Sequence, residues 1–243
     1  MTFFIIGFTL SATIAIAAYY KRALNTSGAM SAIITGTLVF GFGGFFPYLI
    51  FISFFALSSG IQFFTDTKQT AQRSYRQVLA NGLIAVLFIT LYYLEGETIY
   101  YALFIGSVAV SAADTASSEV GILSKRSPVS IFTFRRMEKG LSGAITPLGL
   151  VAGLLTALFY ALLSLIPLGL SFFIPILITG FLGTLIDSAL GTVQVKYKHK
   201  KTISEEKSEN ATHYAGFRWL DNDLVNFLTN AIAVSVMFII WII

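Results

Sequence analysis

The sequence predicts an all-α fold, a polytopic transmembrane helical bundle of about eight spans with basic cytosolic loops. Two observations support this class. Hydrophobic residues make up 56% of the 243 residues, charged residues make up only 12%, and the mean hydropathy is +0.78. A soluble domain carries about 25% charged residues, so this chain has too little polar surface to cover a soluble core. The apolar residues also occur in runs long enough to cross a bilayer.

The predicted spans are bounded by charged or glycine-containing segments. The turn at 41–44, followed by Pro47, separates the second span from the third. The first run lacks the basic segment and the cleavage site of a signal peptide, so we expect a retained helix. We expect residues 1–243 to form a single domain. The spans are 2–20, 28–44, 46–64, 78–94, 98–113, 141–165, 168–190 and 224–243.

The distribution of charge predicts the orientation. All 16 Lys and Arg residues follow the first, third, fifth and seventh spans, which places them on one side of the membrane. The opposite side receives Glu95 and Glu97 and no cation. Cytoplasmic loops carry an excess of Lys and Arg, so we predict that the basic side is cytosolic and both termini lie outside. The polar, mixed-charge segment 196–216 predicts a mobile cytosolic loop.

Polar residues recur at the predicted cytosolic ends of several spans, where an unpaired polar group is costly. These stripes include Gln62 with Asp66 in the third span and Thr184 with Asp187 in the seventh. Oxygen ligands that converge at one depth suit Mg²⁺, which is usually shared between carboxylates and substrate phosphates. Asp187 and Asp114 are therefore the best metal-ligand candidates. The absence of cysteine excludes disulfides, thiolate metal sites and a cysteine nucleophile.

Glu119 is a third candidate ligand. It lies five residues after Asp114, about 140° around an ideal helix. The two carboxylates share a metal only if the helix breaks near Ser117 or Ser118, and the following Gly121 favours such a break.

The segment 111–149 combines five cations and three carboxylates in a chain that otherwise avoids charge. Two interpretations stay open: a cytosolic site for anions, or a positive-inside loop that only sets topology. Gly140 and Gly143, directly after Lys139, favour a glycine-permitted turn that opens the sixth span. Backbone N–H groups at a helix start bind phosphate well. Glycines also allow membrane helices to pack closely, which is the alternative role for these positions.

Six ordered strings make the chain resemble the phytyl-phosphate kinase family over nearly its whole length, and more distantly the dolichol kinases and CDP-diacylglycerol synthases. Leu141-Ser142 replaces the Thr-Asn pair that is more usual in the family, and Asp223 replaces an Asn. The strings are QVLANG (77–82), AADTASSEVG (112–121), LSKRSP (123–128), GLSGAITPLG (140–149), GTLIDSALGTVQ (183–194) and LDNDLVN (220–226).

This resemblance implies a kinase that transfers a phosphoryl group from a nucleoside triphosphate, CTP by preference, to an isoprenoid monophosphate such as phytyl or geranylgeranyl phosphate. The implied partners are these two substrates and membrane lipids, with Mg²⁺ as cofactor and no nucleic acid. The expected catalytic residues are Asp114, Asp187 and Lys125, and the expected metal ligands are Asp114, Glu119 and Asp187. The residues expected to bind nucleotide or phosphate are Asn81, Arg126, Arg135, Arg136, Lys139, Gly140, Gly143, Asn222, Asp223 and Asn226.

Other functions stay open at this point. A lipid-alcohol kinase or a CTP-dependent cytidylyltransferase would use similar carboxylates and cations. An alcohol acceptor would need a positioned base such as Asp114 or Asp223. A lipid transporter or flippase is the non-enzymatic alternative, although transporter sites usually lie near the membrane midplane rather than at one face.

Overall fold

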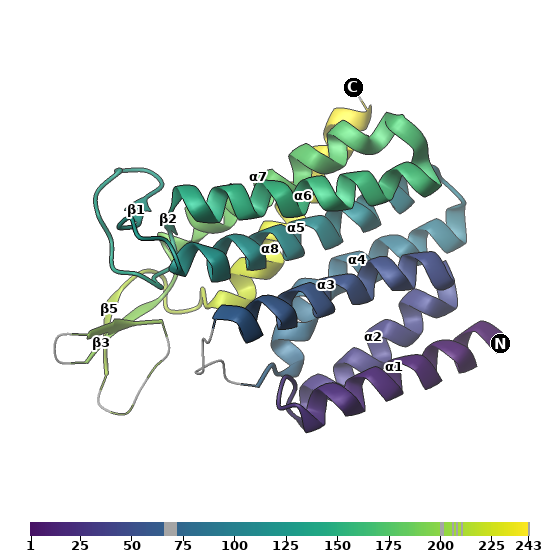
Figure 1. The fold of residues 1–243 in the computed structure, drawn as a ribbon, viewed down its shortest axis with the longest axis horizontal. Helices are drawn as coiled ribbons and strands as arrows, with labels where there is room; N and C mark the ends of the chain where they lie inside the picture. Colours follow the sequence, from purple (N-terminus) through teal and green to yellow (C-terminus); the bar gives the residue numbers. More distant parts are fainter. Residues whose placement is uncertain (66–71, 200–201, 206, 208, 210, 243) are drawn as a thin grey trace.

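A computed structural model describes residues 1–65, 72–199, 202–205, 207, 209 and 211–242, so the predicted stripe residue Asp66 lies outside the described part. Within these ranges, eight α-helices run back and forth along one long axis (Figure 1). The short 3-10 helix η1 (Gly169–Phe172) links the sixth and seventh of them. The helices are α1 (Thr2–Tyr20), α2 (Thr26–Gly43), α3 (Phe45–Thr65), α4 (Tyr75–Glu95), α5 (Thr98–Ile122), α6 (Pro147–Leu168), α7 (Phe173–Gly191) and α8 (Asn222–Ile242).

The predicted helical membrane bundle is confirmed. Six stretches of the described chain are long and apolar enough to cross a membrane, and one of them, the 45 residues of Pro147–Gly191, contains both α6 and α7. In α3, the apolar stretch Phe45–Ile61 is shorter. Eight membrane crossings therefore stay a prediction, although eight helices are present.

Helix α5 forms the centre of the bundle. It contacts α3, α4, α6, α7 and α8, and every residue from 101 to 113 is buried. Glycines of α7 pack directly against it: a Cβ added to Gly183 would lie 2.7 Å from Val110 Cγ1, and one added to Gly180 would lie 3.1 Å from Ala109 Cβ. Small residues let membrane helices approach closely, so these glycines fix the distance between α5 and α7.

Helix α5 is also longer than the predicted span 98–113. It continues to Ile122 and does not break at Ser117 or Ser118. The expected breaker, Gly121, has a packing role instead, because a Cβ added there would lie 3.5 Å from Gly149 Cα of α6. The predicted interruption is therefore wrong.

Capping sets the start of α6. Thr146 Oγ1 accepts a hydrogen bond from the Gly149 N–H at 3.1 Å, and Pro147 occupies the first helical position. Both features are typical of a helix N-terminus. The helix therefore begins at residue 147 rather than 141, and Gly140 and Gly143 belong to the preceding loop.

Short strands lie at the same end of the molecule as this loop. The pair β1 (Val129–Ser130) and β2 (Ala144–Ile145) lies within it. The segment predicted to be a mobile loop instead contains an antiparallel sheet with the order β4-β3-β5. Polar composition suggested irregular structure there, but backbone pairing does not need apolar side chains. These strands are β3 (Lys196–His199), β4 (Thr202–Ser204) and β5 (Thr212–Ala215).

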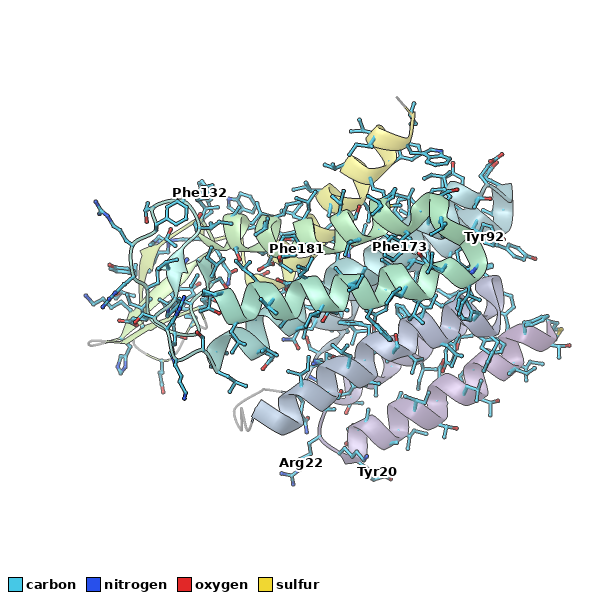
Figure 2. The ribbon with its side chains drawn as sticks, turned by 45° about the horizontal axis from the view of Figure 1, so that its top comes forward. Tyr20, Arg22, Tyr92, Phe132, Phe173 and Phe181 are labelled. Carbon is cyan, nitrogen blue, oxygen red and sulfur yellow. The ribbon has the colours of Figure 1, made fainter. Side chains whose placement is uncertain are left out.

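The two ends of the bundle differ. Figure 1 places the α5–α6 loop and the sheet β3–β5 at one end of the long axis, and both termini toward the other. Figure 2 shows Phe132 at the loop end and Tyr92 and Phe173 toward the opposite end. This arrangement agrees with the alternation of basic segments in the sequence. The assignment of the loop end to the cytosol stays a prediction.

Candidate functional site

A cavity of about 310 Å³ lies at the loop end of the bundle. Its lining combines residues of α3, α4, α5, α7 and α8 with the loop before α6. Polar stripes from separate parts of the sequence therefore meet in one place. Of the residues predicted from the sequence, this cavity is lined by Asn81, Asp114, Glu119, Lys139, Gly140, Gly143, Asp187, Asn222 and Asn226.

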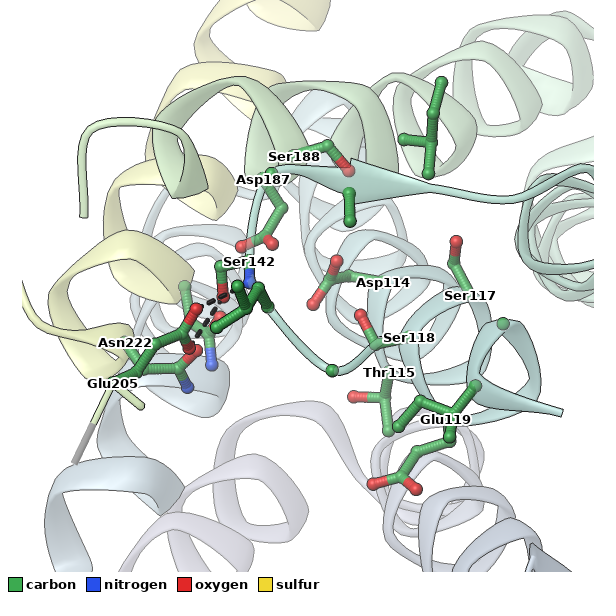
Figure 3. A pocket seen from close by; sticks show the side chains of 18 of the residues that line it. Asp114, Thr115, Ser117, Ser118, Glu119, Ser142, Asp187, Ser188, Glu205 and Asn222 are labelled. Carbon is green, nitrogen blue, oxygen red and sulfur yellow. Dashed lines mark hydrogen bonds between the residues drawn. The ribbon is translucent and has the colours of Figure 1, made fainter. Parts of the chain in front are cut away.

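Two carboxylates of this cavity come from different helices and face each other. Asp114 of α5 and Asp187 of α7 point toward one another (Figure 3), and their carboxyl groups interact directly. Thr229 Oγ1 donates to Asp187 Oδ1 at 3.4 Å. Two carboxylates at such close range repel unless a proton or a cation lies between them. The pair is therefore a candidate site for a hard divalent cation, with its remaining positions open to water or phosphate oxygens.

Glu119 does not join this pair. Because α5 is continuous, the side chain keeps its offset from Asp114, and Figure 3 shows it extending away. Glu119 instead interacts electrostatically with Arg73. Across the described ranges, no group of three or more His, Cys, Asp and Glu side chains is placed to hold a metal. The predicted grouping of all three carboxylates is therefore wrong, and metal binding by Asp114 and Asp187 stays a prediction.

The loop before α6 forms a glycine turn, residues 140–143, that lines the cavity. Gly140 and Gly143 have φ values of +85° and +89°, a region that other residues rarely adopt. Within the turn, the backbone N–H and the hydroxyl of Ser142 donate to the Glu205 carboxylate at 2.5 and 2.9 Å. In this structure the turn therefore holds a carboxylate of the protein itself, and phosphate binding by the turn stays a prediction.

Sequence reasoning missed Glu205. It follows β4, lines the cavity and also accepts a hydrogen bond from Gln194 Nε2 at 2.9 Å. Burial lowers the pKa of Lys196 below its usual value, and the nearby Glu205 carboxylate offsets part of this shift. No local signal distinguishes Glu205 from its acidic neighbours in the sequence. Only the folding of the sheet brings it over the turn.

We expect Glu205→Ala to loosen the attachment of the sheet to the glycine turn. Hydrogen bonds to a charged group contribute about 1.5–3 kcal/mol each, so a net loss of about 1–2 kcal/mol is expected for this half-exposed site. Thermal unfolding and limited proteolysis within 196–216 would measure the effect. Glu209→Ala, at an exposed position, is the control. Equal behaviour of the two variants would contradict the proposed contact.

Four predicted cations lie outside the cavity: Lys125, Arg126, Arg135 and Arg136 are exposed and do not line it. Pairing of β1 with β2 closes the loop and leaves its intervening residues at the surface. The predicted catalytic placement of Lys125 is therefore not supported by its position. Exposed cations beside a membrane interact with anionic lipid head groups, in keeping with the topological interpretation.

Two other cations line the cavity. Lys139 holds the glycine turn through a hydrogen bond from Nζ to the Ser124 carbonyl at 2.6 Å. Arg73, which sequence analysis did not select, is half-buried just before α4. The predicted role of Asp223 in nucleotide binding is not supported by its position. Asp223 does not line the cavity, and its Oδ2 lies 3.5 Å from Arg76 Nε.

Comparisons with known proteins identify relatives of the chain. The model of the family described as Integral membrane protein DUF92 matches residues 9–234. The chain is 37% identical over 150 residues to Uncharacterized membrane protein MJ0933 of Methanocaldococcus jannaschii, covering 58% of this chain and 62% of the relative. It is 31% identical over 167 residues to Protein PGR of Arabidopsis thaliana, covering 60% and 58% respectively.

A third relative is more distant. Chloroplastic Protein VTE6 of Arabidopsis thaliana is 26% identical over 152 residues, covering 57% of this chain and 46% of the relative. The chain thus matches less than two thirds of the length of each of these relatives. No solved structure matches it. The family match extends over nearly the whole chain, and the six sequence motifs lie within it, so the chain belongs to the DUF92 family of integral membrane proteins.

Proposed function

We propose that the chain is a membrane-embedded kinase that transfers the terminal phosphoryl group of a nucleoside triphosphate, CTP by preference, to an isoprenoid monophosphate. The observation that carries this proposal is the facing pair Asp114 and Asp187 in a cavity lined by a glycine turn whose Ser142 N–H donates to a carboxylate. The similarity of six motifs to the phytyl-phosphate kinase family supports the choice of substrates.

The charge balance of the cavity supports the need for a divalent cation. Its described lining has more carboxylates than cations, yet both proposed substrates are anionic. Asp114 and Asp187 fit Mg²⁺ because they supply hard oxygen ligands and leave coordination positions for phosphate. When bound there, Mg²⁺ would neutralise charge on the phosphates. The carboxylates are Asp114, Glu119, Asp187 and Glu205, and the cations are Arg73 and Lys139.

The residues of the chain act mainly by positioning. In the proposed step, an oxygen of the acceptor phosphate bonds to the terminal phosphorus, and the bond to the nucleoside diphosphate breaks with its electrons on the leaving oxygen. A phosphate acceptor is already anionic and needs no strong base. Arg73 and Lys139 offset the repulsion between the phosphates, and Ser142 offers its N–H and hydroxyl once Glu205 is displaced.

The location of the cavity favours an enzyme over a transporter. All of its polar residues lie at the loop end of the helices, whereas transporter sites usually lie near the midplane. With the basic loops in the cytosol, the cavity would face the cytosolic nucleotide pool, and both termini would lie outside.

A product assay tests this function. Purified protein in detergent would receive γ-labelled CTP, Mg²⁺ and a panel of prenyl monophosphates. We expect label in a prenyl diphosphate, release of CDP, and loss of transfer when EDTA removes the metal. Release of pyrophosphate would indicate a cytidylyltransferase, and labelling of a prenyl alcohol would indicate an alcohol kinase. Without transfer to any lipid, the transporter would become the better proposal.

A further inference from the structure

We infer that Arg73 binds the phosphate of a single-chain lipid whose apolar chain enters a crevice between α1, α2 and α3. This inference rests on the proposed function and extends it, because it assigns the acceptor its own site and names the residues that select it. It gives α1 and α2 a role in substrate selection, although both helices lie apart from the Asp114–Asp187 pair in sequence.

The polar cavity adjoins a second, apolar one. This second cavity, about 50 Å³, is lined by small and apolar side chains that include Ala15, Ala18, Ala32 and Ile52. Arg73 and Phe55 line both cavities. A cation at the junction of a polar and an apolar space matches a molecule with an anionic head and an apolar chain. Charge complementarity at Arg73 therefore points to a lipid phosphate as the occupant.

The fold holds Arg73 at this junction. Its backbone N–H donates to the Ala23 carbonyl and its carbonyl accepts from the Asn25 N–H, both at 3.1 Å. Its Nη1 donates to Ser58 Oγ at 2.9 Å. Burial lowers the pKa of the guanidinium, whereas Glu119 raises it. A guanidinium removed from water in this way is stabilised by anionic groups, here Glu119 and, in the inferred complex, the lipid phosphate.

The crevice follows the loop-end half of α1. Its lining on this helix extends from Ser11 to Ala18, about 10 Å at 1.5 Å per residue. The alanines leave room that larger side chains would fill. Because most of α1 faces outward, a longer lipid chain can continue from the crevice into the bilayer. Ala18, only half-buried, is thus a position where added volume would block the chain, and it also packs against the buried cluster of Ala15, Leu24 and Val78.

Binding measured without nucleotide tests this inference. The probe is tritiated geranylgeranyl phosphate, added to the full chain in detergent, with geranylgeraniol and inorganic phosphate as competitors. We expect Arg73→Gln to weaken binding by about tenfold or more, the loss of one charge-assisted interaction. Arg73→Lys should restore part of it. Arg22→Gln, in an exposed loop, is the charge control.

The chain-binding part has its own matched pair. Ala18→Leu should weaken binding of geranylgeranyl phosphate about fivefold or more through lost space in the crevice. Ala17→Leu, at the adjacent exposed position, should bind normally. The inference would be overturned if Arg73→Gln bound as well as Arg22→Gln, if Ala18→Leu bound as well as Ala17→Leu, or if the wild type did not bind. The proposed kinase activity would then be decided by the transfer assay alone. Binding with the expected pattern but no transfer would keep this site and reject the kinase.

Discussion

Asp187→Asn is expected to lower the rate of phosphoryl transfer about a thousandfold while the protein stays folded. The substitution keeps the shape of the side chain and its acceptor for Thr229, but removes one of the two charges proposed to hold a divalent cation. Loss of a single electrostatic group in an active site typically costs 10²–10³ in rate, and loss of a metal ligand also weakens the metal. Transfer would be measured as a function of Mg²⁺ concentration.

Asp223→Asn is the control for this variant. It removes the same charge from the same end of the bundle, but Asp223 lies beside Arg76 rather than at the cavity. We expect transfer within about twofold of the wild type, since Asp223 does not line the cavity. A thermal shift on adding Mg²⁺ should persist in Asp223→Asn and disappear in Asp187→Asn. Full transfer by Asp187→Asn would remove Asp187 from the mechanism.

Gly143→Ala is expected to destabilise the protein by about 2–3 kcal/mol and to raise the KM for the nucleotide. The alanine would adopt an unfavourable positive φ, which costs about 1–2 kcal/mol. Its Cβ would also lie 2.9 Å from the Thr192 backbone nitrogen, so the glycine turn must move away from α7. That movement displaces Ser142 from the cavity. Thermal unfolding and nucleotide kinetics would measure the two effects.

Gly140→Ala separates backbone strain from packing. Gly140 has a similar positive φ, but a Cβ added there meets no atom within 4 Å. The expected loss is therefore about 1–2 kcal/mol, from conformation alone, with little change in nucleotide KM. If the two variants lost the same stability and bound nucleotide equally well, contact between the turn and α7 would have no role in the site.

The pairing of Asp114 with Asp187 was predictable from the sequence. Each carboxylate lies in a polar stripe near the end of an apolar run, and the alternation of spans brings those ends to the same side. The length of α5 was less predictable. Gly121 can break a helix or pack against another, and only the neighbouring Gly149 shows that it packs.

The cations of the site were predicted least well. The sequence drew attention to Lys125, Arg126 and their neighbours because they are dense in one loop, yet they lie at the surface. Arg73 lies in a sparser basic segment, between Lys68 and Arg76, but is placed at the cavity by backbone hydrogen bonds to the α1–α2 loop. A high density of cations along the sequence does not show that they reach the cavity, since a loop can direct its side chains toward the cavity or toward the surface.

The sequence by itself determined the class of protein, the helical bundle and the end of the bundle that carries the site. These follow from composition, from the length of apolar runs and from the spacing of polar residues within a helix, which are all local properties. The tertiary structure alone decided that Glu205 covers the glycine turn, that Glu119 is turned away from the Asp114–Asp187 pair and that Arg73 lines two cavities. Those arrangements depend on strand pairing and helix packing between distant segments, and a sequence pattern does not encode such contacts in its spacing.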